Sequence, residues 1–276
     1  MEQVLKTMLE NVRAKSPLVH NITNYVTVND VANVLLAAGG SPIMSDDADD
    51  VEDITSICGG LNINIGTLNK NTIPSMFLAG KKANALGHIV LLDPVGAGAS
   101  RLRTDTANRL MQEVRFDAVR GNISEIKTLC TGSGSTKGVD ADAVDAVTEA
   151  NLDDGVALVK AFAKQTGCII AVTGAIDLVS DGERCWCIRN GRAEMSRITG
   201  TGCQLSALMT AFLVANPDRK LDAAAAAVCM MGLAGEIGWA NMQPGDGNST
   251  YRSRIIDAIF NMTGDALEEG AKYELR

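Results

Sequence analysis

Two threonines, two glycines and a cysteine form the short stretch 199–203, directly before an apolar run that continues to about Val214. A glycine-containing turn at the start of a helix leaves backbone N–H groups unpaired at the positive end of the helix dipole. That arrangement suits an anion, and a phosphate in particular. Cys203 falls in the first helical turn, where the same field favours a thiolate over a thiol. The stretch therefore predicts an oxyanion cradle with a proton acceptor, the alternative being a glycine-rich loop before a core helix that holds an inert thiol.

Further polar and glycine residues follow short apolar segments that alternate with helical patterns along most of the chain. These segments recur about every 25–35 residues, which predicts an α/β fold of three layers, with a mainly parallel central sheet flanked by helices. In such a sheet, ligands bind beyond the carboxyl ends of the strands. The residues expected at that edge are Asn24, Met44, Gly66, Thr67, Asp93, Arg120, Gly121, Asn122, Glu125, Thr173 and Gly174.

The side chains expected at this edge suit phosphoryl transfer. Asp93 and Glu125 are hard carboxylates that can hold Mg²⁺ through water molecules, and Arg120 can balance phosphate charge. Backbone N–H groups of residues 199–202 can stabilise the transferring phosphoryl group. The sequence offers no serine nucleophile with an adjacent base in a recognisable motif. For each acid, a helix cap or a surface position is the alternative role.

Length and charge narrow the class of protein. The 276 residues suffice for one large α/β domain or two small ones, and we predict a single domain over residues 1–276. Aromatic residues make up only 4% of the chain, so small aliphatic side chains and methionine must fill the core. The net charge of −8 and the absence of a Lys or Arg run argue against a non-specific nucleic-acid binder.

The pattern of apolar residues and cysteines predicts a cytoplasmic protein. The first residues form an amphipathic helical pattern rather than a signal peptide. The longest apolar run, residues 223–235, stops at Glu236, short of the roughly 20 residues that cross a bilayer. The seven cysteines lack paired spacing, which fits reduced thiols. With only two histidines, a zinc site is not expected.

Two polar segments invite functional interpretations that we do not favour. The acidic run 45–50 lacks the order of a calcium loop, and we expect it to cap a helix over 51–58. Residues 131–138 contain glycines and a lysine, but the spacing of a P-loop is absent, which leaves a surface loop.

The remaining elements follow from periodicity and turn residues. Asp181-Gly182 predicts a two-residue hairpin between strands at 177–180 and 184–188. We expect a strand at 116–119, with residues 120–126 opening the next helix, and helices at 202–215, 221–242 and roughly 253–270 to complete the chain.

Six motifs together resemble the hydroxyethylthiazole kinase family. They occur in order over nearly the whole chain and are specific in combination, although each alone is weak. The motifs are Pro-Leu-Val-His-Asn-Ile-Thr-Asn at 17–24, Asn-Ile-Gly-Thr-Leu at 64–68, Leu-Asp-Pro-Val-Gly-Ala at 92–97, Arg-Gly-Asn-Ile-Ser-Glu-Ile at 120–126, Val-Thr-Gly at 172–174 and Gly-Thr-Gly-Cys at 200–203. The chain departs from the family at 247–251, Gly-Asn-Ser-Thr-Tyr, where Gly-Pro-Gly-Ser-Phe is frequent.

This resemblance implies a ribokinase-like fold and transfer of the ATP γ-phosphoryl group to the alcohol of 4-methyl-5-(2-hydroxyethyl)thiazole, a thiamin salvage step. It implies a homotrimer that binds thiazole between neighbouring subunits. It places Met44, Gly200, Asn24 and Gly66 around the thiazole, Arg120 and Thr173 at ATP phosphates, Glu125 and Asp93 at Mg²⁺, and Cys203 where sugar kinases of this fold carry a catalytic aspartate. The alternatives are another enzyme of this fold, such as a sugar or hydroxymethylpyrimidine kinase or a repair dehydratase, and a non-catalytic thiazole- or nucleotide-binding protein.

Overall fold

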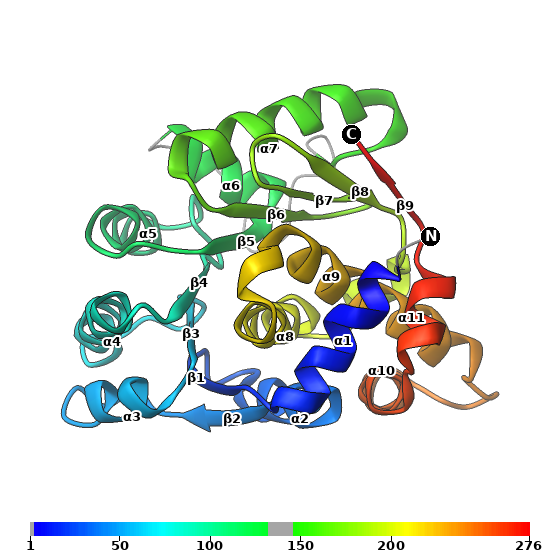
Figure 1. Cartoon of the computed structure of the whole chain (residues 1–276), viewed down its shortest axis with the longest axis horizontal. Helices are drawn as coiled ribbons and strands as arrows, with labels where there is room; N and C mark the ends of the chain where they lie inside the picture. The colour runs from blue at the N-terminus through cyan, green and yellow to red at the C-terminus, as the bar shows by residue number, and fades with distance from the viewer. Residues whose placement is uncertain (1–2, 132–145) are drawn as a thin grey trace.

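One nine-stranded sheet runs through the part of the chain that the computed structural model describes, residues 3–131 and 146–276 (Figure 1). Its strands are β1 (Leu18–Ile22), β2 (Ser41–Met44), β3 (Gly60–Asn64), β4 (Ile89–Asp93), β5 (Ala118–Asn122), β6 (Ile169–Thr173), β7 (Asp177–Ser180), β8 (Cys185–Ile188) and β9 (Tyr273–Leu275). They are ordered β2-β1-β3-β4-β5-β6-β7-β8-β9. Pairing is parallel from β2 to β6 and antiparallel from β6 to β9, so the predicted mainly parallel sheet is confirmed.

Helices cover both faces of this sheet (Figure 1). They are α1 (Val4–Lys15), α2 (Val28–Ala38), α3 (Val51–Ile57), α4 (Thr72–Leu86), α5 (Arg101–Glu113), α6 (Ile123–Thr131), α7 (Leu152–Thr166), α8 (Thr201–Ala215), α9 (Lys220–Ala240), α10 (Asn248–Asn261) and α11 (Gly264–Gly270). Helices α8 and α9 lie against one face, with α1, α2, α10 and α11 packed around them, and α3 to α7 cover the other.

Strand β4 shows why the sequence builds three layers. Its apolar side chains point alternately to opposite faces, so Leu91 joins the core under α8 and α9 while Val90 and Leu92 join the core under α4 and α5. A strand that is buried on both faces reads as a continuous apolar run, as residues 89–92 do. Cys185 and Cys187 on β8 share one face, as their spacing predicts.

Helix α9 is the apolar centre of the α8–α9 layer. Together with the turn before it, residues Pro217–Ala240, it is long and apolar enough to cross a membrane by length and composition alone. However, 78% of its most apolar window is buried inside the fold, as expected of a core helix. Tyr251 of α10 packs edge-on against Trp239 and donates its hydroxyl hydrogen to the carbonyl oxygen of Gly235 at 2.9 Å.

The structure corrects several local predictions. Strand β5 extends to Asn122, two residues beyond Arg120, so Arg120 lies inside a strand and not at the opening of a helix. The loop between β7 and β8 has four residues, 181–184, because Ser180 pairs directly with Cys185. The C-terminal strand β9 follows α11 where only helix was expected.

The predictions for the acidic run 45–50 and for the loop 131–138 compare differently with the structure. Asp50 occupies the N-cap position of α3, but its carboxylate accepts a hydrogen bond from the Ser45 hydroxyl and not from the helix backbone. Among residues 3–131 and 146–276 no cluster of three His, Cys, Asp or Glu side chains could hold a metal, at the acidic run or elsewhere. The predicted surface loop lies outside the described residues, except for Thr131 at the end of α6.

Candidate active site

Asp93 lies at the centre of a buried polar network at the carboxyl end of β4. Its side chain is fully buried. Its Oδ2 atom accepts hydrogen bonds from Asn64 Nδ2 at 2.8 Å and Ser206 Oγ at 2.8 Å, and Arg120 Nη1 lies 3.5 Å away. Burial raises the pKa of Asp93, although the neighbouring Arg120 charge opposes this effect. The Oδ1 atom has no hydrogen-bond partner within the described chain.

Arg120 connects this network to β6 and to the start of α8. Its Nη2 group donates to Thr173 Oγ1 at 2.6 Å, and the residue is only 9% exposed. A Cβ atom on Gly202 would lie 2.5 Å from Nη2, so the glycine allows the guanidinium group to rest against the first turn of α8. The structure therefore brings the three elements predicted to bind phosphate, Arg120, Thr173 and residues 199–203, to one place.

Cys203 is bound into the same network through asparagine side chains. Its sulfur accepts a hydrogen bond from Asn24 Nδ2 at 3.2 Å, and this amide also donates to Asn64 Oδ1 at 3.0 Å. The Asn24 Oδ1 atom accepts from the backbone N–H and the hydroxyl of Thr27, at 3.1 and 3.0 Å. Because the protein itself uses both ends of the Asn24 amide, Asn24 serves the site by holding Cys203 and the α2 start.

The expected thiolate at Cys203 is not supported by its surroundings. Burial raises the pKa of the Cys203 thiol, and the Asp93 charge raises it further, whereas the Arg120 charge and the Asn24 and Asn64 side chains lower it. Cys203 lies in the first turn of α8, as predicted, and burial makes the largest contribution to its raised pKa. A pKa raised above the ordinary thiol value describes a neutral thiol near pH 7, which favours the second of the two alternatives that the sequence left open.

Gly200 and Gly66 lie where a Cβ atom would collide with neighbouring side chains. Gly200 is the N-cap of α8 with a φ angle of +85°, and a Cβ atom there would overlap Cγ2 of Thr27. A Cβ atom on Gly66 would lie 2.9 Å from Asn64 Oδ1, which also accepts the Gly66 N–H at 2.9 Å. Both glycines allow backbone segments to approach the network closely.

Met44 lines a small cavity next to this network, at the end of the edge strand β2. The cavity has a volume of about 160 Å³. Its lining includes Met44, Ser45, Asn64, Thr67, Tyr25, Met76 and Asn21. Asn64 belongs both to the cavity wall and to the network, so it joins Met44 to the predicted Asn24 and Gly66 positions. Tyr25 lies at the rim with 78% of its surface exposed.

Glu125 forms a reciprocal cap at the start of α6. Its Oε2 atom accepts the Asn122 N–H at 2.8 Å, while Asn122 Oδ1 accepts the Glu125 N–H at 2.8 Å, which is the arrangement of a capping box. Its Oε1 atom accepts the Gly96 N–H at 2.8 Å. Burial, followed by the Asp93 charge, raises the pKa of Glu125 to about 7. The side chain thus has the capping role that the sequence left open as the alternative.

The order of these residues along the chain also matches a known family. Residues 9–265 match the sequence profile of the hydroxyethylthiazole kinase family. The chain belongs to this family. It is 58% identical to a hydroxyethylthiazole kinase from Clostridium acetobutylicum over 271 residues, which cover 98% of this chain and 99% of the relative.

Solved structures agree with the family. The chain is similar to a hydroxyethylthiazole kinase protein from Pyrococcus horikoshii, with a TM-score of 0.87 and 32% identity over 99% of this chain and 98% of that one. It shares its fold with a ribokinase-like superfamily protein from Enterococcus faecalis, with a TM-score of 0.61 and 11% identity over 94% of each chain. The predicted family, its kinase class and the ribokinase-like fold are therefore confirmed. The roles predicted for individual residues stay predictions.

Three residues that complete the network have no role predicted from the sequence. Asn64 and Ser206 both donate to Asp93. Arg103 of α5 donates to the carbonyl oxygens of Gly66 at 2.8 Å and Val95 at 3.2 Å, and so joins the loops that follow β3 and β4. Asn64 ends its strand within a motif of the kinase family, which is a usable signal. Ser206 and Arg103 lie in ordinary helical patterns and carry none.

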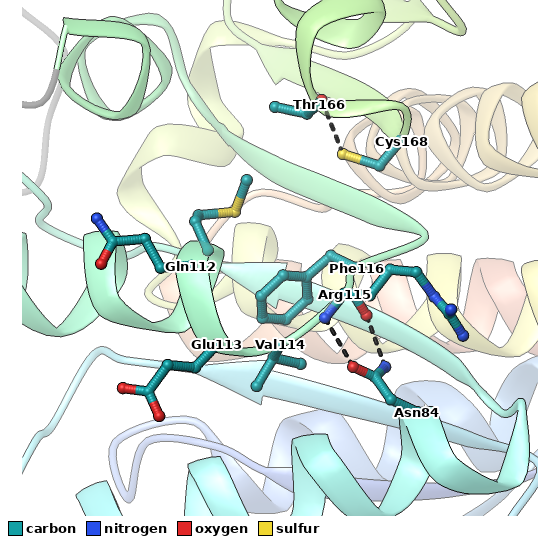
Figure 2. Close-up of a pocket in the computed structure, with 9 residues that line it drawn as sticks. Asn84, Gln112, Glu113, Val114, Arg115, Phe116, Thr166 and Cys168 are labelled. Carbon is teal, nitrogen blue, oxygen red and sulfur yellow. Dashed lines mark hydrogen bonds between the residues drawn. The ribbon is translucent and has the colours of Figure 1, made fainter.

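A larger cavity of about 420 Å³ lies away from this network (Figure 2). Its lining residues include Arg115 and Phe116 just before β5 and Cys168 just before β6, so it opens at the amino ends of the strands. Figure 2 shows the Asn84 amide hydrogen-bonded to the backbone of Arg115. None of the predicted site residues lines this cavity.

Proposed function

We propose that this chain transfers the γ-phosphoryl group of ATP to the primary alcohol of 4-methyl-5-(2-hydroxyethyl)thiazole, giving the thiazole phosphate and ADP. The observation that carries the proposal is the convergence of Arg120, Thr173 and the first turn of α8 beside Cys203 and Asp93, in a member of the hydroxyethylthiazole kinase family. This placement offers donors for phosphate next to a hydrogen-bonding group for an alcohol.

The proposed residues act mainly by position and charge. The alcohol oxygen attacks the γ-phosphorus in line as the bond to the ADP oxygen breaks. Arg120 and Thr173 bind phosphate oxygens. The backbone N–H groups at the start of α8 stabilise the negative charge on the transferring phosphoryl group. Because the transition state is loose, the alcohol proton leaves late, to solvent water, and needs no strong base. Cys203, as a neutral thiol, orients the hydroxyl group.

Asp93 and Glu125 are the carboxylates that would hold a magnesium ion at this site. Mg²⁺ is usually held by one or two carboxylates, water and substrate phosphates. Asp93 Oδ1 is buried without a hydrogen-bond partner in the described chain, and the Asp93 charge contributes to the raised pKa of Glu125. Both observations indicate negative charge at Asp93 and Glu125, which a bound cation would neutralise. When bound, Mg²⁺ would neutralise charge on the phosphate oxygens.

The proposed thiazole pocket lies around the cavity at Met44, next to Asn24, Gly66 and Gly200. Met44 offers an adaptable apolar surface for a ring, and Asn64 leads from it towards Cys203. Tyr25, which lines this cavity, is 78% exposed, and Val26, the next residue along the chain, is 58% exposed. We propose that a neighbouring subunit of a homotrimer covers this rim.

We further propose a cytoplasmic enzyme with one domain. All seven cysteines are free thiols, as expected in a reducing compartment. The single sheet that continues from β2 to β9 supports one domain.

A coupled assay for ADP release tests the proposed reaction. With ATP and Mg²⁺, we expect ADP release that depends on hydroxyethylthiazole and that an Arg120→Ala variant, purified in the same way, has largely lost. Release that instead follows hydroxymethylpyrimidine or a sugar would indicate another kinase of this fold. Tight binding of hydroxyethylthiazole without any ADP release would indicate a non-catalytic binding protein.

A further inference from the structure

Asn64 connects the ends of three strands through one buried side chain. It ends β3 and is 1% exposed. Its Nδ2 group donates to Asp93 at the end of β4, while its Oδ1 atom accepts from Asn24, beyond the end of β1, and from the Gly66 N–H. No role for this residue follows from the family motifs described above.

These contacts determine which way two amide groups face. The backbone N–H of Gly66 can only donate, so it holds Asn64 Oδ1 and turns the Asn64 Nδ2 group towards Asp93. That orientation requires Asn24 to present Nδ2, and the same nitrogen then donates to Cys203 at 3.2 Å. At the other end, the Thr27 backbone N–H requires an acceptor and holds Asn24 Oδ1 in place. The sulfur of Cys203 is thus an acceptor towards Asn24, which leaves its S–H free to point elsewhere.

We propose that Asn64 is a positioning residue for the kinase reaction, which acts through Asn24 to fix the hydrogen-bonding direction of the Cys203 thiol. The Gly66 N–H sets the orientation of Asn64, and Asp93 accepts from its Nδ2 group. The link to turnover rests on the proposed function, whereas the arrangement of the three side chains does not.

The pH profile of alkylation at Cys203 tests this arrangement without relying on activity. The rate of modification by iodoacetamide, resolved by mass spectrometry at the Cys203 peptide, follows the thiolate. The charged groups beside Cys203 are Asp93 and Arg120, and both are kept in every variant. Loss of the Asn24 N–H removes a donor to the thiolate, so Asn24→Ala should move the rising limb to higher pH by about one unit.

The double variant separates action through Asn24 from a direct effect. Asn64→Ala should cause a shift similar to that of Asn24→Ala, and the two substitutions together should shift the limb no further than Asn24→Ala alone. Additive shifts, or an unchanged profile in Asn64→Ala, would overturn the proposal. In turnover, Asn64→Ala should lower kcat about tenfold while the KM for ATP changes less than twofold. A wild type without ADP release would refute the proposed function, yet the alkylation profiles would still decide the role of Asn64.

Asn62 supplies the matched control. It is a fully buried asparagine on the same face of β3, two residues earlier, and donates to Asn21 Oδ1 at 3.0 Å. Asn62→Ala should leave the Cys203 profile unchanged, and an equal shift there would mean that any buried amide on β3 has this effect. Cys229, which is fully buried, reports general unfolding. If Asn64→Ala exposes Cys229 to modification, Asn64→Leu, which fills the same space, replaces it in the comparison.

Discussion

At Cys203, two physical effects on a thiol act in opposite directions. The first turn of α8 favours a negative sulfur, whereas burial and the nearby Asp93 raise the pKa of the thiol. The side chain lies inside the network and not at the protein surface, and desolvation of the thiolate makes the largest contribution to the raised pKa. A neutral thiol can orient a substrate hydroxyl but is a poor proton acceptor.

We therefore expect Cys203→Ser to keep kcat within about tenfold of the wild-type value, because a hydroxyl can also orient the substrate. General-base catalysis typically contributes about 10²–10⁴-fold. A loss of that size in Cys203→Ser, recovered in Cys203→Asp, would assign the base role to the thiol instead. Steady-state kinetics with saturating ATP and thiazole measure the effect. Cys130→Ser, a half-buried cysteine in α6, controls for loss of a thiol elsewhere.

The raised pKa of Glu125 predicts that the free energy of unfolding depends on pH when no ligand is bound. Its pKa rises from 4.5 to about 7 on folding, so the folded state binds the proton more tightly than the unfolded state. The protonated Glu125 side chain therefore stabilises the folded state fully below about pH 4.5. This stabilisation, on the order of 3 kcal/mol, is lost as the pH rises through about 7. Glu125→Gln has no charge to bury, so it should gain stability relative to wild type between pH 5 and 8.

Urea unfolding at several pH values, without Mg²⁺ or nucleotide, measures this difference. Glu269→Gln, at an exposed position of α11, should follow the wild-type curve. A constant difference between Glu125→Gln and wild type from pH 5 to 8 would show that the Glu125 carboxyl is not desolvated as the structure indicates.

At the scale of elements, helix α8 reaches the site through two glycines. Gly202 makes room for the Arg120 guanidinium group, and Gly200 makes room for Thr27 at the start of α2. The close approach of these two helix starts places Asn24, which precedes α2, beside Cys203. The position of the thiol therefore depends on the contact between two helix N-termini and not on α8 alone.

Gly200→Ala should destabilise the fold by more than the strain of a positive φ angle. That strain costs an alanine about 1–2 kcal/mol, and overlap with Thr27 Cγ2 adds to it. Gly87→Ala measures the strain alone, because Gly87 has a φ angle of +71° and no atom within 4 Å of the added Cβ. Thr27→Ser removes Cγ2 and should recover part of the loss in Gly200→Ala but none in Gly87→Ala. Thermal unfolding of the four variants decides whether the overlap exists.

The elements themselves could be predicted where one physical signal is strong. The apolar run of β4 and the glycine that ends α2 identify their elements from local sequence alone. Strand β9 could not be predicted, because three residues with exposed, intermediate and exposed side chains form a strand only by pairing with β8. The helical role expected for Arg120 failed for a related reason, since β5 continues through Gly121 only because β6 lies beside it.

In the candidate site, too, some features could be predicted from local sequence and others depend on distant residues. The motif residues Asp93, Arg120, Thr173 and Cys203 were predicted together and lie together, because parallel strands end at one edge. Their hydrogen bonds were not predictable, since the partners Asn24, Asn64 and Ser206 come from distant parts of the chain. The protonation of Cys203 stayed open in the sequence, because burial cannot be read from its neighbours along the chain.

At the scale of the whole molecule, the proposed thiazole pocket lies at one side of the sheet. It adjoins β2, the strand at the edge opposite β9 (Figure 1). Tyr25 in its lining and the following residue Val26 are both largely exposed. A cavity of about 160 Å³ with an open rim encloses a ligand poorly. A second subunit seated on the rim would complete the enclosure, which links assembly to substrate binding.

If assembly and substrate binding are linked, one substitution should change both the oligomeric state and the KM for thiazole. Light scattering of the wild type should give about three times the 29.0 kDa chain mass. Val26→Glu places a charge in the proposed contact, so it should lower the mass and raise the KM for thiazole more than the KM for ATP. Phe260→Glu, at a 67% exposed phenylalanine of α10, provides a control with an equal change in charge and should alter neither value. A monomeric Val26→Glu protein with an unchanged KM for thiazole would show that a single subunit encloses the substrate, and the shared pocket would have to be abandoned.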